Sequence, residues 1–325
     1  MSSARDHSSS LSTPAGQSAA QSAAPDLAEL LASAPGVTPV DDAAFAAAYE
    51  ATGDVGRARL KTCIARLHVL YGAAGGAGGG DVREGSTAIR WRQGFASLEQ
   101  VAPCAWTLVC VDAAWTSAPR LLAALLPALF AGVGSVAVVR VNGDGPWPAP
   151  VLAALELAGQ EVVADAAPAV MPALLRSFAH GGASQGMGRL LLLGEHPDAA
   201  SDQARALGVP VWRDDPAPII GIADGTPEIA RFDRLDAAAA LRAAHPDAAF
   251  VEVPATPSAL VSQTPLAAVA CGPDHASAWL GHAGLVLGPG HEWCWMHPGL
   301  SPAWFTRRAV ALLPVPPSRA VADLP

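Results

Sequence analysis

Short apolar runs alternate with segments of helical periodicity through the middle of the chain. WTLVCVD (106–112) has the composition of a buried strand, SAPRLLAALLPALFAGV (117–133) predicts a helix ended by glycine, and GSVAVVRVN (134–142) predicts the next strand. The same alternation continues with helices at 148–160, 168–182, 198–209 and 234–244, strands at 161–165, 188–195, 216–224 and 248–253, and a last pair of segments at 276–288 and 301–313. Such a pattern is typical of parallel sheets with helices on both faces. We therefore predict an α/β protein with two similar Rossmann-like α/β/α domains and mainly parallel sheets.

The N-terminal part of the chain follows a different pattern. Residues 1–36 scatter Ser, Gln, Gly and Pro without the apolar core of a secretory signal, which predicts a disordered tail. From Pro39 to Tyr71 apolar residues recur at helical spacing after the N-cap candidates Asp41 and Asp42, which predicts one or two helices. GAAGGAGGG (72–80) lacks the Lys-Ser/Thr pair of a phosphate loop and predicts a flexible connector.

These patterns divide the chain into regions. With 325 residues, the length indicates about two domains of ordinary size. We predict a helical N-terminal segment at 37–104 that joins the second domain, a first α/β domain at 105–215 and a second at 216–325. Loops at the carboxyl ends of parallel strands commonly bind ligands, so a small molecule is the expected partner.

Composition and charge exclude several classes of protein. Hydrophobic residues make up 51% and charged residues 15%, too apolar for a disordered chain, and the most apolar stretch, Leu121–Val141, is interrupted by Pro and Gly. The net charge is −9 and Lys61 is the only lysine, so no basic stripe exists to bind nucleic acid. The five cysteines form no CxxC pair. We expect a reduced, cytoplasmic protein with no membrane or nucleic-acid partner.

Nine phrases occur in the order in which one enzyme family has them. They are 57–72, 97–112, 117–139, 151–174, 188–195, 209–224, 241–253, 283–289 and 300–312. From about Arg57 to Leu312 the chain resembles histidinol dehydrogenase, the NAD- and zinc-dependent enzyme that ends histidine biosynthesis. The resemblance implies two domains of the aldehyde-dehydrogenase type, oxidation of L-histidinol by two hydride transfers to NAD, and a homodimer. It also implies a helix at the last phrase.

The positions that carry the family's chemistry differ in this chain. Val-Asp-Ala-Ala (111–114) replaces a Tyr-Val-Pro-Gly-Gly turn that approaches the ligand closely, and Ala217 replaces a substrate-contacting serine. The family's proton-transfer Glu-His corresponds to Leu266 and Ala267, which cannot transfer a proton. The family's C-terminal tail, which supplies a zinc histidine to the partner subunit, has no counterpart before Pro325.

Three residues are nevertheless candidates for the inherited site. The family holds zinc partly through Gln-x-x-His, one helical turn apart; here the spacing gives Arg242 and His245, and arginine repels a cation. His297 stands where the family has a histidine after asparagine, so the resemblance implies His245 and His297 as metal ligands. Asp112 ends the first strand and is the candidate for cofactor binding, although an N-cap role explains it equally well.

HEWCWMH (291–297) also suggests a metal site of its own. On a helical turn, His291, Cys294 and His297 would share a face and could hold zinc or copper, with His245 as a fourth ligand. The alternative is a loop in which the tryptophans and Cys294 pack. Pro and Gly on both sides favour the packing interpretation.

The sequence thus predicts a divergent, shortened histidinol dehydrogenase-like protein with most catalytic positions altered. The alternatives are a non-catalytic binding or scaffolding paralogue and an unrelated metal-binding protein built on HEWCWMH. If the scaffold has been retained while the chemistry has been lost, no acid and imidazole should gather with His245 around one pocket.

Overall fold

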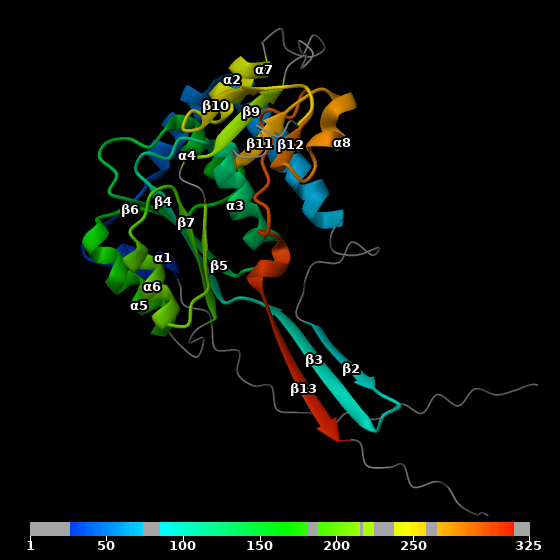
Figure 1. Ribbon diagram of the computed structural model, residues 1–325. Coiled ribbons are helices and arrows are strands. Elements are labelled where there is room, and N and C mark those ends of the chain that lie inside the picture. Colours follow the sequence, from blue (N-terminus) through cyan, green and yellow to red (C-terminus); the bar gives the residue numbers. More distant parts are fainter. Residues whose placement is uncertain are drawn as a thin grey trace, which may run out of the picture.

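Two parallel sheets form the body of the protein (Figure 1). The computed structural model describes residues 27–73, 85–180, 187–214, 217–223, 237–257 and 265–314. The first sheet has the order β1-β6-β5-β4-β7-β8 and the second β10-β9-β11-β12. The strands are β1 Val37–Pro39, β4 Trp106–Asp112, β5 Ser135–Val141, β6 Val163–Ala166, β7 Gly188–Leu193, β8 Val211–Arg213, β9 Ile219–Ala223, β10 Ala249–Val253, β11 Leu266–Ala270 and β12 Ala283–Leu287. Only β1 is antiparallel to its neighbour in these two sheets, so the predicted α/β class with mainly parallel sheets is confirmed.

Helices cover both faces of the first sheet. They are α1 Leu27–Ser33, α2 Asp42–Ala73, α3 Ala118–Phe130, α4 Ala149–Leu157, α5 Met171–His180 and α6 Asp198–Ala206, while α7 Ala237–Ala244 and α8 Ala276–Trp279 belong to the second sheet's region. Alternate residues of a strand face opposite sides: Val109 and Val111 pack with α2, α3 and α4, and Leu108 and Cys110 pack with α1, α5 and α6. Among the described residues, no helix is long and apolar enough to cross a membrane.

One position in the first sheet tests this packing directly. A Cβ atom on Gly188 would lie 2.0 Å from Cε2 of Trp106, whose fully buried ring packs against Phe178. We expect Gly188→Ala to lower the free energy of unfolding by about 1–3 kcal/mol through overpacking. Gly134→Ala is the control, since nothing lies within 4 Å of the added methyl group. Urea unfolding measures both, and equal losses would contradict the prediction.

Helix α2 confirms the predicted one or two helices. The Asp41 carboxylate accepts a hydrogen bond from the Ala44 amide at 2.8 Å and caps the first turn. A kink follows at Gly53, whose φ of 67° is outside the helical range. After the kink, Leu60 and Leu67 pack against α3 and α4. The first two residues of the predicted connector, 72–80, belong to α2, and the rest lies outside the described residues.

Residues 27–36 differ from the predicted disordered tail. Helix α1 buries Leu27 and Leu31, one turn apart, in the core on the α5 side of the first sheet. The apolar pair is short, and only contact with a distant part of the chain gives it a surface to cover. Residues 1–26 lie outside the described part.

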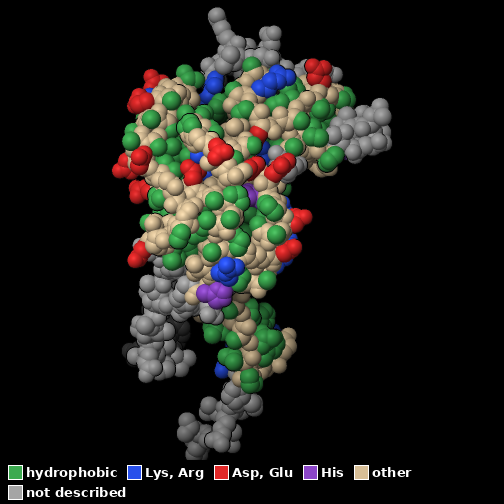
Figure 2. Space-filling view, turned by 90° about the vertical axis from the view of Figure 1, so that its left-hand side faces the viewer, with side chains coloured by type: hydrophobic (Ala, Val, Ile, Leu, Met, Phe, Trp, Pro, Cys, Tyr) green, Lys and Arg blue, Asp and Glu red, His purple; other side chains and the backbone are tan. Residues whose placement is uncertain are grey.

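A three-stranded antiparallel arm projects from the body (Figures 1 and 2). It consists of β2 Gly85–Arg90, β3 Phe95–Pro103 and β13 Thr306–Pro314, in the order β13-β3-β2. The segment 37–104, predicted as helical, therefore contains the strands β2 and β3 after α2. The helix expected at 300–312 is also wrong: a 3-10 turn, Pro302–Phe305, leads into β13. Pairing with β3, some 200 residues away, decides this outcome. The domain boundaries themselves stay a prediction.

Candidate functional site

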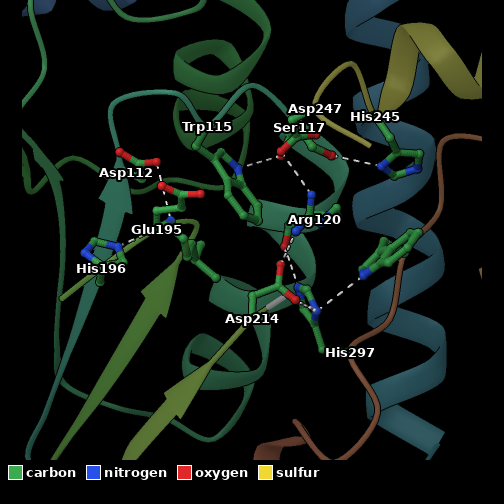
Figure 3. Close-up of polar contacts among 12 residues, drawn as sticks. Asp112, Trp115, Ser117, Arg120, Glu195, His196, Asp214, His245, Asp247 and His297 are labelled. Carbon is green, nitrogen blue, oxygen red and sulfur yellow. Dashed lines mark hydrogen bonds and ion pairs between the residues drawn. The ribbon is translucent and has the colours of Figure 1, made fainter. Parts of the chain in front are cut away.

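A buried polar cluster lies between segments of the two sheets and centres on Arg120 (Figure 3). Arg120 comes from the first turn of α3 and has no solvent exposure. Its Nη2 donates to Asp214, directly after β8, and its Nη1 donates to Oδ2 of Asp247 at 3.0 Å, between α7 and β10. The guanidinium also lies 4.1 Å from the ring centroid of Trp115. One cation therefore ties the two sheet regions together.

His297 joins this cluster from the loop after β12. Its Nε2 donates to the Arg120 carbonyl at 2.9 Å, and its Nδ1 lies 3.3 Å from Oδ1 of Asp214. The Nε1 of Trp295 also lies 3.3 Å from this Nδ1. Both ring nitrogens of His297 therefore contact protein groups.

His245 reaches the cluster from the end of α7. Its Nδ1 is 2.9 Å from the hydroxyl of Ser117, which also donates to the Ala244 carbonyl at 3.1 Å. Ser117 occupies the N-cap position of α3, yet its hydroxyl does not cap that helix. The other nitrogen of His245, Nε2, is buried without a hydrogen bond of ordinary geometry. Its environment disfavours a charged imidazole.

The titration of the cluster follows from burial and from the arginine. Burial and then the positive charge of Arg120 lower the pKa of His245 to about 3. Burial by itself raises the pKa of Asp214, but His297 and Arg120 outweigh it and hold that pKa below its ordinary value. For Asp247, burial outweighs Arg120 and the pKa is raised. At neutral pH the cluster therefore holds a neutral His245 beside an arginine and ionised Asp214.

A second group of polar residues lies at the carboxyl edge of the first sheet. Strand order changes direction between β4 and β7, which makes this edge a topological switch point. Asp112 ends β4, and its Oδ2 accepts a hydrogen bond from the Glu195 amide at 3.4 Å. His196 Nε2 lies 3.0 Å from the Leu193 carbonyl; burial lowers the pKa of His196, although that carbonyl and Asp112 oppose the shift. The predicted cofactor residue Asp112 thus lies beside an acid and an imidazole (Figure 3).

The candidate ligands of HEWCWMH do not converge. The segment is a loop with a turn and no helix. His291 is exposed, Cys294 Sγ accepts from Arg66 Nη1 at 3.0 Å, and His297 faces Asp214. Trp295 is buried against the core. These contacts agree with the packing interpretation, except that Cys294 is only half-buried.

The arrangement of sheets occurs in solved structures. Histidinol dehydrogenase from Elizabethkingia anophelis superposes with a TM-score of 0.56 over 85% of this chain and 76% of that chain, at 13% identity. The chain has the fold of histidinol dehydrogenase. At this identity the likeness concerns the fold alone. An aldehyde dehydrogenase from Bacillus cereus gives a TM-score of 0.45 at 9% identity, covering 89% of this chain and 84% of that chain. No family model and no curated protein matches the sequence.

The cluster around Arg120 does not fit the zinc ion that the resemblance to histidinol dehydrogenase implies. Zinc needs about four nitrogen, sulfur or oxygen ligands within roughly 2.0–2.3 Å. Here His297 uses both nitrogens on protein groups, His245 turns Nδ1 to Ser117, and the Arg120 guanidinium supplies the cation for both aspartates. Within the described ranges, no group of three or more His, Cys, Asp or Glu could hold a metal. The metal role predicted for His245 and His297 finds no support in this arrangement.

The lack of a metal ligand set in the described part of the chain gives a measurable expectation. Because Arg120 neutralises Asp214 and Asp247 in the fold, we expect extensive EDTA dialysis to leave the midpoint of thermal unfolding unchanged. Differential scanning calorimetry before and after dialysis, with zinc added back, makes the measurement. A midpoint that rises with zinc in the wild type, and not in His297→Ala, would show that a metal site exists.

The switch point of the first sheet does not fit the diphosphate of NAD bound at the N-terminus of α3. Dinucleotide phosphates commonly approach glycines at the turn that leads into such a helix. The turn here, 112–118, contains no glycine and carries the buried Trp115, and Ser117 turns towards His245. Asp112 and Glu195 add negative charge at this edge. Carboxylates suit hydroxyl or amine groups of a ligand better than its phosphates. Cofactor binding by Asp112 stays a prediction.

Sequence reasoning missed the centre of the cluster. Arg120, Asp214 and Asp247 were not among the candidates, although Asp214 and His297 lie in the same buried cluster as His245. One signal was available: Arg120 interrupts an otherwise apolar helix, and a buried arginine requires charged partners. The identity of those partners was not encoded locally.

Proposed function

We propose that this protein uses the histidinol-dehydrogenase fold to bind a small molecule without oxidising it. The observation that carries the proposal is the position of Arg120. Its guanidinium is paired with Asp214 and Asp247 and lies beside the two histidines that the resemblance implies as zinc ligands. A structural cation in this place favours a role for the cluster in joining the sheets over a role in chemistry.

The available bases support the same proposal. Oxidation of an alcohol requires a group that removes the hydroxyl proton. The pKa of His245 is about 3, which makes it a poor proton acceptor at neutral pH. His297 is engaged at both nitrogens, and Leu266 and Ala267 occupy the positions that the resemblance assigns to proton transfer.

Activity measurements test the proposal directly. Purified full-length protein with L-histidinol, NAD and zinc should reduce no NAD above the rate of a protein-free control. Arg120→Gln serves as a matched variant because it removes the cation and keeps a polar side chain. Turnover by the wild type that is lost in His245→Ala would overturn the proposal and favour an NAD-dependent oxidoreductase.

The arm supports a further proposal, that two copies of the chain associate. Ile89, Val310 and Leu312 are exposed on one face of the three-stranded sheet and Leu98 and Leu313 on the other, and Figure 2 shows hydrophobic side chains over this region. The sheet also ends in the nine-residue edge strand β13. Long apolar edge strands readily pair with another chain.

We expect the double substitution Val310→Glu/Leu312→Glu to convert a dimer into monomers. Carboxylates at both positions would be costly to bury and would repel their copies in a symmetric contact. Sedimentation velocity measures the change. Val55→Glu, at an exposed valine on α2, is the matched control and should leave the assembly intact. A wild type that sediments as a monomer, or a dimer unaffected by the arm variant, would contradict this proposal.

A further inference from the structure

We infer that a groove between α2 and β12 binds a small amphipathic carboxylate, a molecule with an apolar body and one anionic end. The inference rests on the proposed function, a small-molecule binder, and names the place and the chemical class of the ligand. It concerns neither the Arg120 cluster nor the switch point around Asp112.

The groove has the size and the lining of a ligand site. Its volume is about 820 Å³, within the range of cavities that bind small molecules. The apolar lining comes from the second half of α2, from β12 and from the loop after β12, and includes Ala65, Val69, Leu70, Leu285, Leu287 and Met296. Volume and lining together suit an aliphatic or aromatic body of roughly ten to fifteen carbon atoms.

The α2 face of this groove is exposed in the described structure. Val69 is 71% exposed and Leu70 is 48% exposed, whereas Leu67, which also lines the groove, is buried in the core beside the first sheet. The opposite wall of the groove is already packed, because Leu287 and Trp295 belong to the core of the second sheet. An apolar ligand would remove exposed α2 side chains from water against a wall that is already formed.

The charges that line the groove have one sign. Lys61 and Arg66 line it, and no Asp or Glu does, although the chain carries a net charge of −9. Arg66 is held in place: its Nη1 donates to the Gly290 carbonyl at 2.7 Å and to Cys294 Sγ at 3.0 Å. Lys61 is exposed. An anionic end can therefore pair with Lys61 while the apolar body lies along α2.

The shape of the site favours a free molecule over a membrane or a second copy. An open groove suits a single alkyl chain, whereas a flat or convex patch would suit a bilayer surface. The chain's proposed self-association surface is the arm, and Figure 1 shows β12, one wall of the groove, apart from the arm.

Binding of dodecanoate to the full-length protein tests the inference. Isothermal titration below the micelle concentration should give a saturable 1:1 complex for the wild type. We expect Lys61→Glu to weaken binding at least tenfold and Lys61→Arg to retain it. Arg205→Glu, an exposed cation on α6, is the matched control and should bind as the wild type does. Dodecanol, which lacks the charge, should bind the wild type and Lys61→Glu equally.

A chemical readout avoids any effect of substitution on folding. Lys61 is the only lysine, so an amine-reactive acetylating reagent modifies one side chain besides the N-terminal amine. Dodecanoate should protect Lys61 at least fivefold, measured by mass spectrometry, and leave the N-terminal amine equally reactive.

Several results would overturn the inference. The first two are that Lys61→Glu binds dodecanoate as tightly as the wild type and that dodecanoate does not protect Lys61. The third is that the protein co-sediments with anionic phospholipid vesicles and does not bind dodecanoate. The fourth is a dimer that Val69→Asp dissociates and that dodecanoate does not perturb. NAD reduction with L-histidinol would instead contradict the proposed non-catalytic function. The two failures are therefore distinguishable, because the dodecanoate titration contains neither NAD nor histidinol.

Discussion

Replacing Arg120 by methionine is expected to lower the free energy of unfolding by about 3–5 kcal/mol, since it leaves buried carboxylates without a cation. Asp214 and Asp247 both pair with this guanidinium, and Arg120 itself has no solvent exposure. The substitution also removes the charge stacked on Trp115. Urea unfolding followed by circular dichroism measures the loss.

Two variants show whether the effect comes from unpaired buried charge. Arg213→Met removes a cation from a solvent-exposed pair with Asp198 and should cost at most about 1 kcal/mol. The triple variant Arg120→Met/Asp214→Asn/Asp247→Asn should recover much of the loss, because no buried carboxylate is left without a partner. A single Arg120→Met variant within 1 kcal/mol of the wild type would show that the cluster is not a stabilising centre.

Stability is expected to fall by about 2 kcal/mol between pH 7.5 and pH 5 because of His245. The folded pKa is about 3, below the ordinary value of 6.5. As pH falls through 6.5, the unfolded chain binds a proton at this imidazole and the folded chain does not. The free energy of unfolding therefore decreases across that window, and continues to decrease towards pH 3. Below about pH 4 the lowered pKa of Asp214 adds a loss of the same sign.

His245→Gln isolates this contribution. Glutamine does not titrate, so the variant should lose most of the slope between pH 7.5 and pH 5, measured by urea unfolding at several pH values. His196 also has a lowered pKa, so His196→Gln shows how much of the slope belongs to that residue. His180→Gln, at an exposed histidine ending α5, should keep the full slope. A slope that survives in His245→Gln would contradict the assignment.

Local patterns sufficed for the parallel sheets. The central strands of the first sheet are buried on both faces, so their residues are apolar without alternation. Such apolar runs can be recognised in the sequence. The strands of the arm could not be predicted from a local pattern of this kind. Strand β13 contains Ala and Leu that also suit a helix, and pairing with β3 decided between the two.

The candidate site divides in the same way. The resemblance to histidinol dehydrogenase pointed to His245 and His297, and its position after a strand pointed to Asp112; the structure gives the two histidines a common centre that was not anticipated. Asp214 and Asp247 lie 94 and 127 residues from Arg120 along the chain. No local pattern relates residues at such separations.

By itself the sequence determined the apolar alternation, a helix N-cap at Asp41 or Asp42, and the packing of helices against parallel strands, because these depend on neighbours a few residues away. Only the tertiary structure decided that Arg120 pairs with two aspartates and that β3 and β13 pair in an arm. It also decided that α2 and β12 line an apolar groove that carries Lys61 and Arg66. These features depend on contacts between distant segments, whose energies arise from burial and charge after the chain has folded.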